Sequence, residues 1–192
     1  MKSEKNITGI ILAGGKSSRM GSDKGFVMYK NKAFIQHIIE AIQPLVQEII
    51  IVSNNPDYDI FKLKRVTDII ENAGPLAGVY TGLHYTTTEN NLVVSCDVPL
   101  INSETLSFLI DEIDEKSDVV QLESQGKTMP LIALYKKNCK ETCYKILQKG
   151  ERRLRVALSH LTIKTITLEK THEIFTSNIN TPIDLSEAEK PI

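Results

Sequence analysis

The sequence has little cysteine and no long apolar segment, and both absences limit what the protein can be. Its 192 residues include three cysteines, too few and odd in number for a disulfide framework, so we expect a reducing compartment. No apolar stretch approaches the roughly 18 to 20 residues that span a bilayer, and the initial MKSEKN is not followed by the apolar segment of a secretory signal. We therefore expect a cytoplasmic protein with no membrane partner.

The sequence also lacks a strong net charge, an internal repeat and a Pro/Gly/Ser-rich linker. Lysine and arginine number 23 against 24 acidic residues, a formal net charge of -1. A protein that coats nucleic acid needs a basic excess on at least one face, so we expect no nucleic-acid partner and a small-molecule ligand instead. Because the length suits one hydrophobic core and no linker divides it, we predict a single domain over residues 1–192.

Apolar runs rich in isoleucine and valine alternate with segments of helical period. This alternation predicts an α/β fold with a mostly parallel sheet, and a hairpin around Gly126 adds an antiparallel portion. Asn102 or Ser103 can cap one helix, and Pro182 suits the first turn of the last one. The expected strands cover residues 7–12, 48–53, 91–96, 118–122 and 131–135, and the expected helices include residues 33–43, 76–85 and 103–115.

The glycine-rich segment LAGGKSSRMGSDK directly follows the first expected strand. A Walker A motif would need a glycine five residues before the one in GKS, and the sequence has Ile10 there. The glycines also miss the spacing of the dinucleotide-binding motif. Both of these nucleotide-binding motifs are therefore excluded.

The same segment can still bind a triphosphate. Its glycines allow backbone N–H groups to converge on an anion or a base edge without a Cβ in the way. Arg19 can hold phosphate oxygens as a planar fork while Lys24 supplies a mobile point charge. The alternative is a solvated basic loop that needs its glycines only for the turn, and the segment alone does not decide between the two.

Two later segments favour the nucleotide interpretation. In GPLAG, residues 74–78, small side chains would let a ligand approach, although tight packing of a helix on the sheet explains Ala77 and Gly78 as well. In CDVP, a lone carboxylate, Asp97, follows an apolar strand, and such a group suits Mg²⁺ completed by substrate phosphates and water. Asp97 could instead cap the turn that follows it. In an open parallel sheet, ligands bind outside the carboxyl ends of the strands, where the glycine-rich loop and Asp97 are both expected.

Five segments in order, over residues 7–186, resemble the MobA-type molybdenum cofactor guanylyltransferases of the nucleotidyltransferase superfamily. They are LAGGKSSRMGSDK, GPLAG, CDVPL, GERRLRVAL and NINTPIDL. The resemblance implies a three-layer, Rossmann-like GT-A fold. It also implies an enzyme that uses Mg²⁺ to transfer GMP from GTP to the terminal phosphate of molybdopterin, releasing pyrophosphate.

The implied reaction needs no general base, because the acceptor phosphate is already a nucleophile at neutral pH. This agrees with the sequence, whose four histidines fall outside every motif. The resemblance further implies a monomer that meets other cofactor-assembly proteins and recipient molybdoenzymes transiently.

The resemblance assigns residues to three roles. Arg19, Lys24 and Asp97 are the implied catalytic residues, with Asp97 as the metal ligand. The implied nucleotide-binding residues are Leu12, Ala13, Gly14, Gly15, Lys24, Asn55, Asp68, Gly78 and Asp97. The implied acceptor-binding residues are Arg152, Arg153, Asn178 and Asn180.

The sequence departs from the family pattern at two places, and rival functions stay open. Ser53-Asn54-Asn55 offers two asparagines that could read the base, of which we favour Asn55, and Met129 replaces a charged or imidazole side chain of the relatives. The closest rival is a cytidylyltransferase acting on the same pterin, whose first loop is implied to read LAAG. Others are a cobinamide-phosphate guanylyltransferase, a sugar-phosphate nucleotidyltransferase and a GTP-binding regulatory module without turnover.

Overall fold

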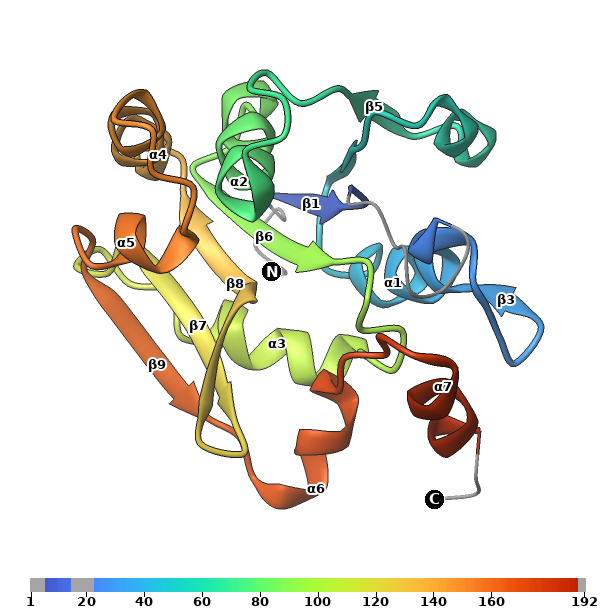
Figure 1. Ribbon diagram of the computed structural model, residues 1–192. Helices are drawn as coiled ribbons and strands as arrows, with labels where there is room; N and C mark the ends of the chain where they lie inside the picture. The colour runs from blue at the N-terminus through green and yellow to red at the C-terminus, as the bar shows by residue number, and fades with distance from the viewer. Residues whose placement is uncertain (1–5, 15–22, 190–192) are drawn as a thin grey trace.

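A computed structural model describes residues 6–14 and 23–189, and its centre is a seven-stranded sheet (Figure 1). Its order is β5-β4-β1-β6-β8-β7-β9, and β2 and β3 form a separate hairpin. The strands are β1 (Ile7–Leu12), β2 (Met28–Tyr29), β3 (Lys32–Ala33), β4 (Glu48–Val52), β5 (Lys64–Val66), β6 (Asn90–Ser95), β7 (Val119–Ser124), β8 (Lys127–Lys136) and β9 (Ile163–Thr167).

The direction of the strands confirms the mixed sheet expected from the sequence. β5, β4, β1 and β6 run parallel to one another. β8 is antiparallel to both β6 and β7, and β9 is parallel to β7. The sheet is therefore mostly parallel with one antiparallel strand near its middle.

Helices cover both faces of this sheet, so the fold has three layers (Figure 1). α1 and α3 pack on one face, and α2, α4 and α5 pack on the other. None of the helices in the described part of the chain is both long and apolar enough to cross a membrane. The helices are α1 (Phe34–Ile42), α2 (Gly74–Tyr85), α3 (Ser103–Asp111), α4 (Cys139–Gln148), α5 (Leu154–Leu158), α6 (Lys170–Glu173) and α7 (Pro182–Ala188), with 3-10 helices η1 (Lys24–Phe26), η2 (Pro56–Phe61) and η3 (Ile174–Thr176).

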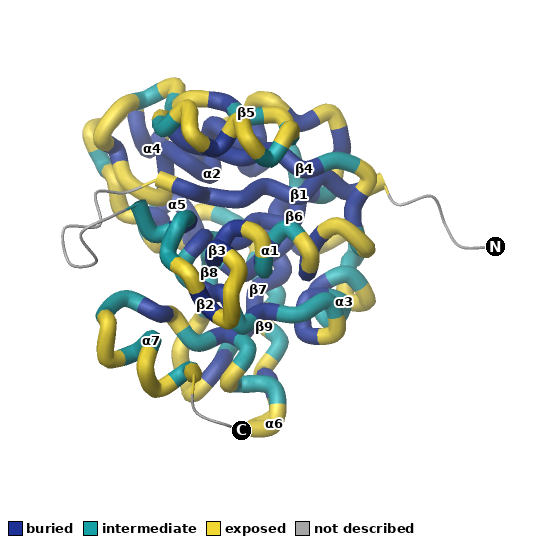
Figure 2. The backbone as a smooth tube through the Cα atoms, turned by 90° about the vertical axis from the view of Figure 1, so that its right-hand side faces the viewer, coloured by how far each residue is buried: buried dark blue, intermediate teal, exposed yellow. Residues whose placement is uncertain are grey.

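The central strands are apolar along their whole length because both of their faces are covered. All six residues of β1 are buried, with Ile10 facing α2 and Ile11 facing α1. Figure 2 shows the buried backbone running through β1, β4 and β6. β-branched side chains fit such a doubly covered strand, which is why the isoleucine and valine runs predicted these elements correctly. The three cysteines are free and buried, in agreement with the absence of a disulfide framework.

The hairpin and the helix starts also follow from local sequence. Gln125 and Gly126, at φ 53° and 71°, join β7 to β8, and two positive φ values are those of a type I′ hairpin turn. The side chain of Asn102 accepts a hydrogen bond from Thr105 N at 2.8 Å and so caps α3. Pro182 occupies the first turn of α7, as expected.

Other boundaries differ from the sequence expectations. The helix expected over residues 103–115 ends at Asp111, because Asp114 turns the backbone by binding the N–H groups of Lys116 and Ser117. The two edge strands β5 and β9 were not expected. β5 has one apolar residue among three, and IKTIT in β9 is half-polar, so neither has the apolar run of an inner strand.

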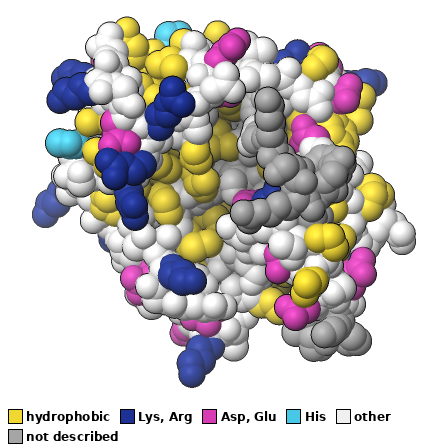
Figure 3. Space-filling view, viewed as in Figure 1, with side chains coloured by type: hydrophobic (Ala, Val, Ile, Leu, Met, Phe, Trp, Pro, Cys, Tyr) yellow, Lys and Arg dark blue, Asp and Glu magenta, His cyan; other side chains and the backbone are white. Residues whose placement is uncertain are grey.

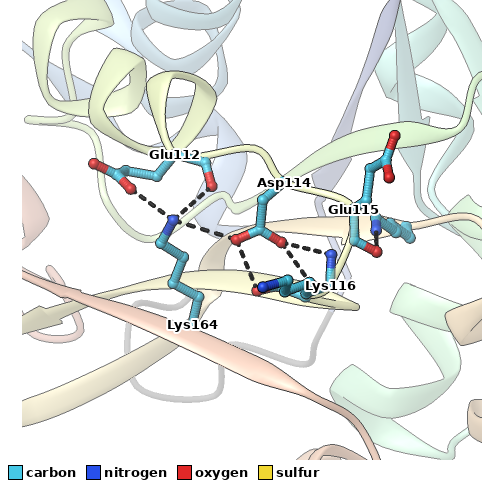
Figure 4. Close-up of polar contacts among 7 residues, drawn as sticks. Glu112, Asp114, Glu115, Lys116 and Lys164 are labelled. Carbon is cyan, nitrogen blue, oxygen red and sulfur yellow. Dashed lines mark hydrogen bonds and ion pairs between the residues drawn. The ribbon is translucent and has the colours of Figure 1, made fainter.

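The end of the sheet opposite the strand carboxyl ends is held by a polar cluster (Figure 4). Lys164 Nζ of β9 lies 2.7 Å from Glu112 Oε2 and 3.3 Å from Asp114 Oδ2. The pKa of Asp114 is lowered to about 2. The hydrogen bond from the backbone N–H of Ser117 is the largest cause, and Lys164 contributes to the shift. This cluster fixes the link between α3 and β7 and connects it to the edge strand.

The carboxyl ends of β1, β4 and β6 meet at one edge of the sheet, next to the C-terminal segment. Leu12 lies opposite Val52 and Ser95 in the register of these strands. The backbone N–H of Ile179 donates to the carbonyl of Asp97 at 2.8 Å. This bond places the segment before α7 beside the loop that follows β6, as Figure 1 also shows.

Candidate active site

Three segments of the chain converge at this edge on Lys24, Asp97 and Asn180. Lys24 Nζ lies 3.6 Å from Asp97 Oδ2 and donates a short hydrogen bond to Asn180 Oδ1. The side chains of Lys24 and Asp97 are 21% and 20% exposed, so they remain accessible to a ligand while the protein around them limits access by water. A cation, a carboxylate and an amide therefore share one partly enclosed location.

Asp97 is fixed in orientation by the end of β6. Ser95, the last residue of that strand, donates a short hydrogen bond from its Oγ to Asp97 Oδ1. The carbonyl of Asp97 accepts the Ile179 N–H, so both the backbone and the side chain of Asp97 are held. Oδ2 of Asp97 points toward Lys24.

The neighbouring thiol is not a nucleophile. Cys96 is buried, and burial above all raises its pKa to about 12, with the negative charges of Asp97 and Asp23 adding to the effect. The thiol therefore stays protonated at neutral pH and acts as a small apolar side chain.

Asn180 is held by the start of α7. Its backbone N–H donates to Asp184 Oδ2 at 2.8 Å, and the N–H of Thr181 donates to the same oxygen at 2.9 Å. Thr181 in turn caps the helix by accepting from Asp184 N. These bonds, chiefly the one from Asn180, lower the pKa of Asp184. The amide of Asn180 thus reaches Lys24 from a fixed helix start, whereas Asn178 is exposed.

The residues expected to bind the guanine base lie at the ends of β1, β4 and β5. Ala13 is buried and donates its N–H to Val52 O at 3.0 Å, which extends β1 by one residue. Gly14 follows in an exposed position, and a Cβ built on it would meet no described atom within 4 Å. Among the described residues, the position that a side chain of residue 14 would take is therefore unoccupied. Gly15 and Arg19 lie outside the described residues.

Asp68 and Asn54 form a pair across the ends of two neighbouring strands. Asp68 N donates to Asn54 Oδ1 at 2.9 Å, and Asn54 Nδ2 donates to Asp68 Oδ2 at 3.4 Å. Burial raises the pKa of Asp68, and the negative charge of Glu71 raises it further. The hydrogen bond from Asn54 acts in the opposite direction and lowers the pKa, but burial has the larger effect. The pair leaves acceptor capacity on Asp68 for a base or ribose.

Asn55, which the sequence favoured as the base reader, makes two hydrogen bonds within the protein. Its Oδ1 accepts from Asp57 N at 3.0 Å, which caps η2, and its Nδ2 donates to Asp23 Oδ2 at 3.1 Å. Contact of Asn55 with a base stays a prediction. The amide already has a role in joining the loop after β4 to the residue that precedes Lys24.

Gly78 lies inside α2, against the sheet. A Cβ at this position would come within 3.3 Å of the Leu12 side chain, so the helix packs closely on the end of β1. This contact accounts for the small residue by packing. The expected role of Gly78 near the ribose stays a prediction.

Arg152 and Arg153 lie before α5, away from the Lys24 cluster. Arg152 donates to the carbonyl of Asn72 at 3.0 Å, next to the start of α2. Arg153 pairs with Glu151, and this bond raises the pKa of Arg153 and lowers that of Glu151 to about 2. In Figure 3, lysine and arginine side chains gather on the left of this face, over α4 and α5. The two arginines could meet an anionic ligand that extends along this face.

Sequence reasoning missed Asp23, Tyr58 and Ser95 as parts of the site. Ser95 could have been found, since a hydroxyl two residues before the expected metal ligand can bind it. Asp23 could also have been found, because it directly precedes the expected catalytic residue Lys24. Tyr58 lies in a segment with no strand or helix period, and its contact with Asp23 is visible only in the structure.

A mostly parallel sheet that gathers a lysine and a carboxylate at its carboxyl edge is the arrangement of nucleotide-binding α/β proteins. Residues 9–164 match the model of the MobA-like NTP transferase domain. The chain therefore belongs to the MobA-like NTP transferase family and is a nucleotidyltransferase, as the resemblance implied.

Individual relatives agree with this assignment. The probable molybdenum cofactor guanylyltransferase of Flavobacterium johnsoniae is 35% identical over 183 residues, covering 95% of this chain and 96% of that protein. The protein of the same description from Clostridium perfringens strain SM101 is 39% identical over 169 residues, covering 85% and 84%. The fold is that of the molybdopterin-guanine dinucleotide biosynthesis protein A from Archaeoglobus fulgidus, with a TM-score of 0.81, 24% identity and coverage of 95% and 96%.

Proposed function

We propose that the protein transfers GMP from GTP to the terminal phosphate of molybdopterin, forming the guanine dinucleotide cofactor and pyrophosphate. The observation that carries this proposal is the meeting of Lys24, Asp97 and Asn180 at the carboxyl edge of the sheet. Two relatives that cover most of the chain are described as probable molybdenum cofactor guanylyltransferases, which supports the choice of substrates.

In the proposed reaction an oxygen of the acceptor phosphate forms a bond to the α-phosphorus of GTP. The bond from that phosphorus to the oxygen bridging the α- and β-phosphates breaks, and pyrophosphate leaves with the electron pair. The acceptor oxygen is ionised at neutral pH, so no side chain needs to remove a proton. Positioning and charge neutralisation are what the protein must supply.

Among the described residues, Lys24 is placed to neutralise charge. Its ammonium group is mobile enough to follow the triphosphate, and it starts from a position between Asp97 and Asn180. As the bond to pyrophosphate breaks, negative charge grows on the leaving oxygen, and a cation that lies beside it stabilises the transition state more than the ground state. Arg19, expected on the other side of the triphosphate, remains part of the proposal from sequence alone.

Asp97 is a single carboxylate that suits Mg²⁺ completed by phosphates and water, since no group of three or more possible metal ligands occurs among the described residues. The carboxylate is accessible, its orientation is fixed by Ser95, and hard oxygen ligands of this kind are those that Mg²⁺ takes together with phosphate oxygens. When bound, the ion would add positive charge beside the phosphates. We propose Asp97 as its ligand.

The guanine base is proposed to lie over Leu12, Ala13 and Gly14, next to Asp68. The absence of a Cβ at Gly14, with no described atom within 4 Å of that position, supports close approach of a planar base to the backbone there. The second asparagine candidate, Asn54, is joined to Asp68, so these two side chains present a combined donor and acceptor edge. Asn55, Gly15 and Gly78 complete the proposed nucleotide site.

The acceptor is proposed to meet Asn178, Asn180, Arg152 and Arg153. Asn180 contacts Lys24, so an acceptor phosphate bound there would lie beside the reacting phosphates. We also propose that the chain is one domain, acts as a monomer in the cytoplasm, and contacts cofactor-assembly proteins and recipient molybdoenzymes transiently.

Pyrophosphate release tests the proposal. It is measured from each of the four nucleoside triphosphates with Mg²⁺ and molybdopterin, for the wild type, Asp97→Asn and the control Asp111→Asn, an exposed carboxylate at the end of α3. We expect release from GTP only, dependent on the pterin, lost in Asp97→Asn and kept in the control. Preference for CTP would favour the cytidylyltransferase, and GTP binding without pyrophosphate from any acceptor would favour the regulatory module.

A further inference from the structure

Asp23, the residue directly before Lys24, binds three groups from different parts of the chain. Its Oδ1 accepts from Gly25 N at 3.1 Å and from the hydroxyl of Tyr58, and its Oδ2 accepts from Asn55 Nδ2 at 3.1 Å. Asp23 is thereby the cap of η1, the short 3-10 helix that carries Lys24. One carboxylate connects this turn to the loop after β4 and to η2.

Tyr58 holds this contact from inside the core. Its side chain is fully buried, and its ring lies 4.6 Å from that of Phe26, the last residue of η1. In the described part of the chain, the hydroxyl has Asp23 as its side-chain partner. Burial, followed by the hydrogen bond to Asp23, raises the pKa of Tyr58, so the phenol stays a donor throughout the neutral range. Breaking this bond would leave a buried polar group unpaired, which is costly.

Gly25 shows how closely the turn approaches the tyrosine. A Cβ at this position would overlap the Tyr58 hydroxyl, so the backbone of η1 runs directly over it. Within the turn, Phe26 N donates to Asp23 O at 3.0 Å and Val27 N to Lys24 O at 3.1 Å, and the Phe26 ring packs against Tyr58 and Phe61. The side-chain hydrogen bonds of Asp23 therefore link this turn to the loop after β4 and to η2, beside the packing of the Phe26 ring.

The turn determines where the ammonium group of Lys24 can reach. Lys24 extends from η1 to Asp97 and Asn180 while Asp23, one residue earlier, is held by Tyr58 and Asn55. We propose that Tyr58 and Asn55, acting through Asp23, position Lys24 for the transfer reaction. They are positioning residues, and this inference rests on the role of Lys24 in the proposed function.

The same contacts connect the two halves of the nucleotide site. Asn54 binds Asp68, where the base or ribose is proposed to lie, and the next residue, Asn55, binds Asp23 beside Lys24. The loop after β4 thus links the proposed base site to the phosphate-binding lysine.

A double-mutant cycle tests the positioning role. Tyr58→Phe removes the hydroxyl and keeps the ring, and Tyr135→Phe is the matched control, because Tyr135 is also buried and donates one hydrogen bond, to Pro130 O at 2.7 Å. Both variants are made in the wild type and in Lys24→Met. Thermal unfolding, kcat and KM for GTP are measured for each, with GTP affinity determined separately by calorimetry.

If Tyr58 acts through Lys24, Tyr58→Phe lowers kcat about tenfold in the wild type, comparable to removing one well-placed hydrogen bond, and changes it little in Lys24→Met. Tyr135→Phe leaves kcat within about twofold in both backgrounds. This holds even if Tyr135→Phe lowers the unfolding temperature as much as Tyr58→Phe does. Equal losses from Tyr58→Phe in both backgrounds, or an unchanged kcat in the wild type, would overturn the inference.

The same double-mutant cycle, measured on GTP affinity by calorimetry, separates this inference from the proposed function. If the wild type binds GTP but releases no pyrophosphate with molybdopterin, the proposed reaction fails, and non-additive effects of Tyr58→Phe and Lys24→Met on GTP affinity still support positioning. Additive effects on affinity in that case would overturn it. A wild type that neither binds GTP nor turns it over would overturn both proposals.

Discussion

Lys24 Nζ lies 3.6 Å from Asp97 Oδ2, although one side chain comes from η1 and the other from the loop after β6. Each group also has a second partner, Asn180 for the lysine and Ser95 for the aspartate. The ion pair is partly exposed, and such pairs contribute only about 0 to 1 kcal/mol to stability. Stability therefore accounts for little of this arrangement, which agrees with the proposed binding of phosphate and metal here.

Replacing Lys24 by methionine should reduce activity far more than stability. Loss of one preorganised charge at the reacting phosphates costs on the order of 3 kcal/mol of transition-state stabilisation, roughly a hundredfold or more in kcat. Asp97→Asn should cause a loss of the same order, and the unfolding temperature should change by no more than a few degrees in either variant. Steady-state kinetics and thermal unfolding of both variants check this. A tenfold loss or less in Lys24→Met would remove the lysine from its proposed catalytic role.

Asn180→Ala should weaken the use of the acceptor. The substitution removes the amide that accepts from Lys24 but keeps the backbone N–H that binds Asp184, so α7 keeps its cap. A hydrogen bond to a charged group is worth about 1.5 to 3 kcal/mol, so we expect kcat/KM for the pterin to fall about tenfold or more. Kinetics at varied pterin and saturating GTP measure the effect. Asn138→Ala, an exposed asparagine with no side-chain cap bond at the start of α4, is the control and should leave kcat/KM unchanged.

The fold could be predicted from sequence where one physical cause dominates. The inner strands β1, β4 and β6 are covered on both faces, so their isoleucine and valine runs are continuous and easily recognised. The edge strands β5 and β9 have polar residues facing solvent and give no such signal. Their place in the sheet depends on hydrogen bonds to neighbouring strands, which local sequence does not encode.

The candidate site was predictable for residues whose chemistry suffices to suggest a role. Lys24 and Asp97 were expected together and lie together. Asn55 shows the limit of this reasoning, because its direction depends on Asp23, a partner that reaches it only once the sheet and η1 have formed. Tyr58 was missed for the same reason.

Stability at low pH should depend on Asp114. Its pKa is lowered from 3.8 to about 2, mainly by the Ser117 N–H, so the ionised form stabilises the fold above pH 4. This contribution is present above the unfolded-state pKa and is lost as pH falls through the folded-state value, between about pH 4 and 2. Asp114→Asn should therefore unfold at lower urea than the wild type at pH 7, and the difference should shrink at pH 2.5.

Glu115→Gln is the control for this measurement. Glu115 is exposed and adjoins Asp114, and its carboxylate is in none of the ion pairs of the described residues. The control should follow the wild type at both pH values. A difference between Asp114→Asn and the wild type that stays constant from pH 7 to pH 2.5 would contradict the assignment of the acid-sensitive contribution to this carboxylate.

Gly82 in α2 and Gly14 after β1 should respond in opposite ways to alanine. At Gly82, a Cβ would overlap Ile10 in the core, and overpacking of this kind costs about 1 to 3 kcal/mol. At Gly14, a Cβ meets no described atom, so Gly14→Ala should keep the unfolding temperature of the wild type while raising KM for GTP several-fold, because the methyl group occupies space proposed for the base. Gly82→Ala should instead lower the unfolding temperature and leave KM for GTP nearly unchanged in the folded protein. Unfolding curves and GTP kinetics of the two variants check both expectations, and an unchanged KM in Gly14→Ala would place the base elsewhere.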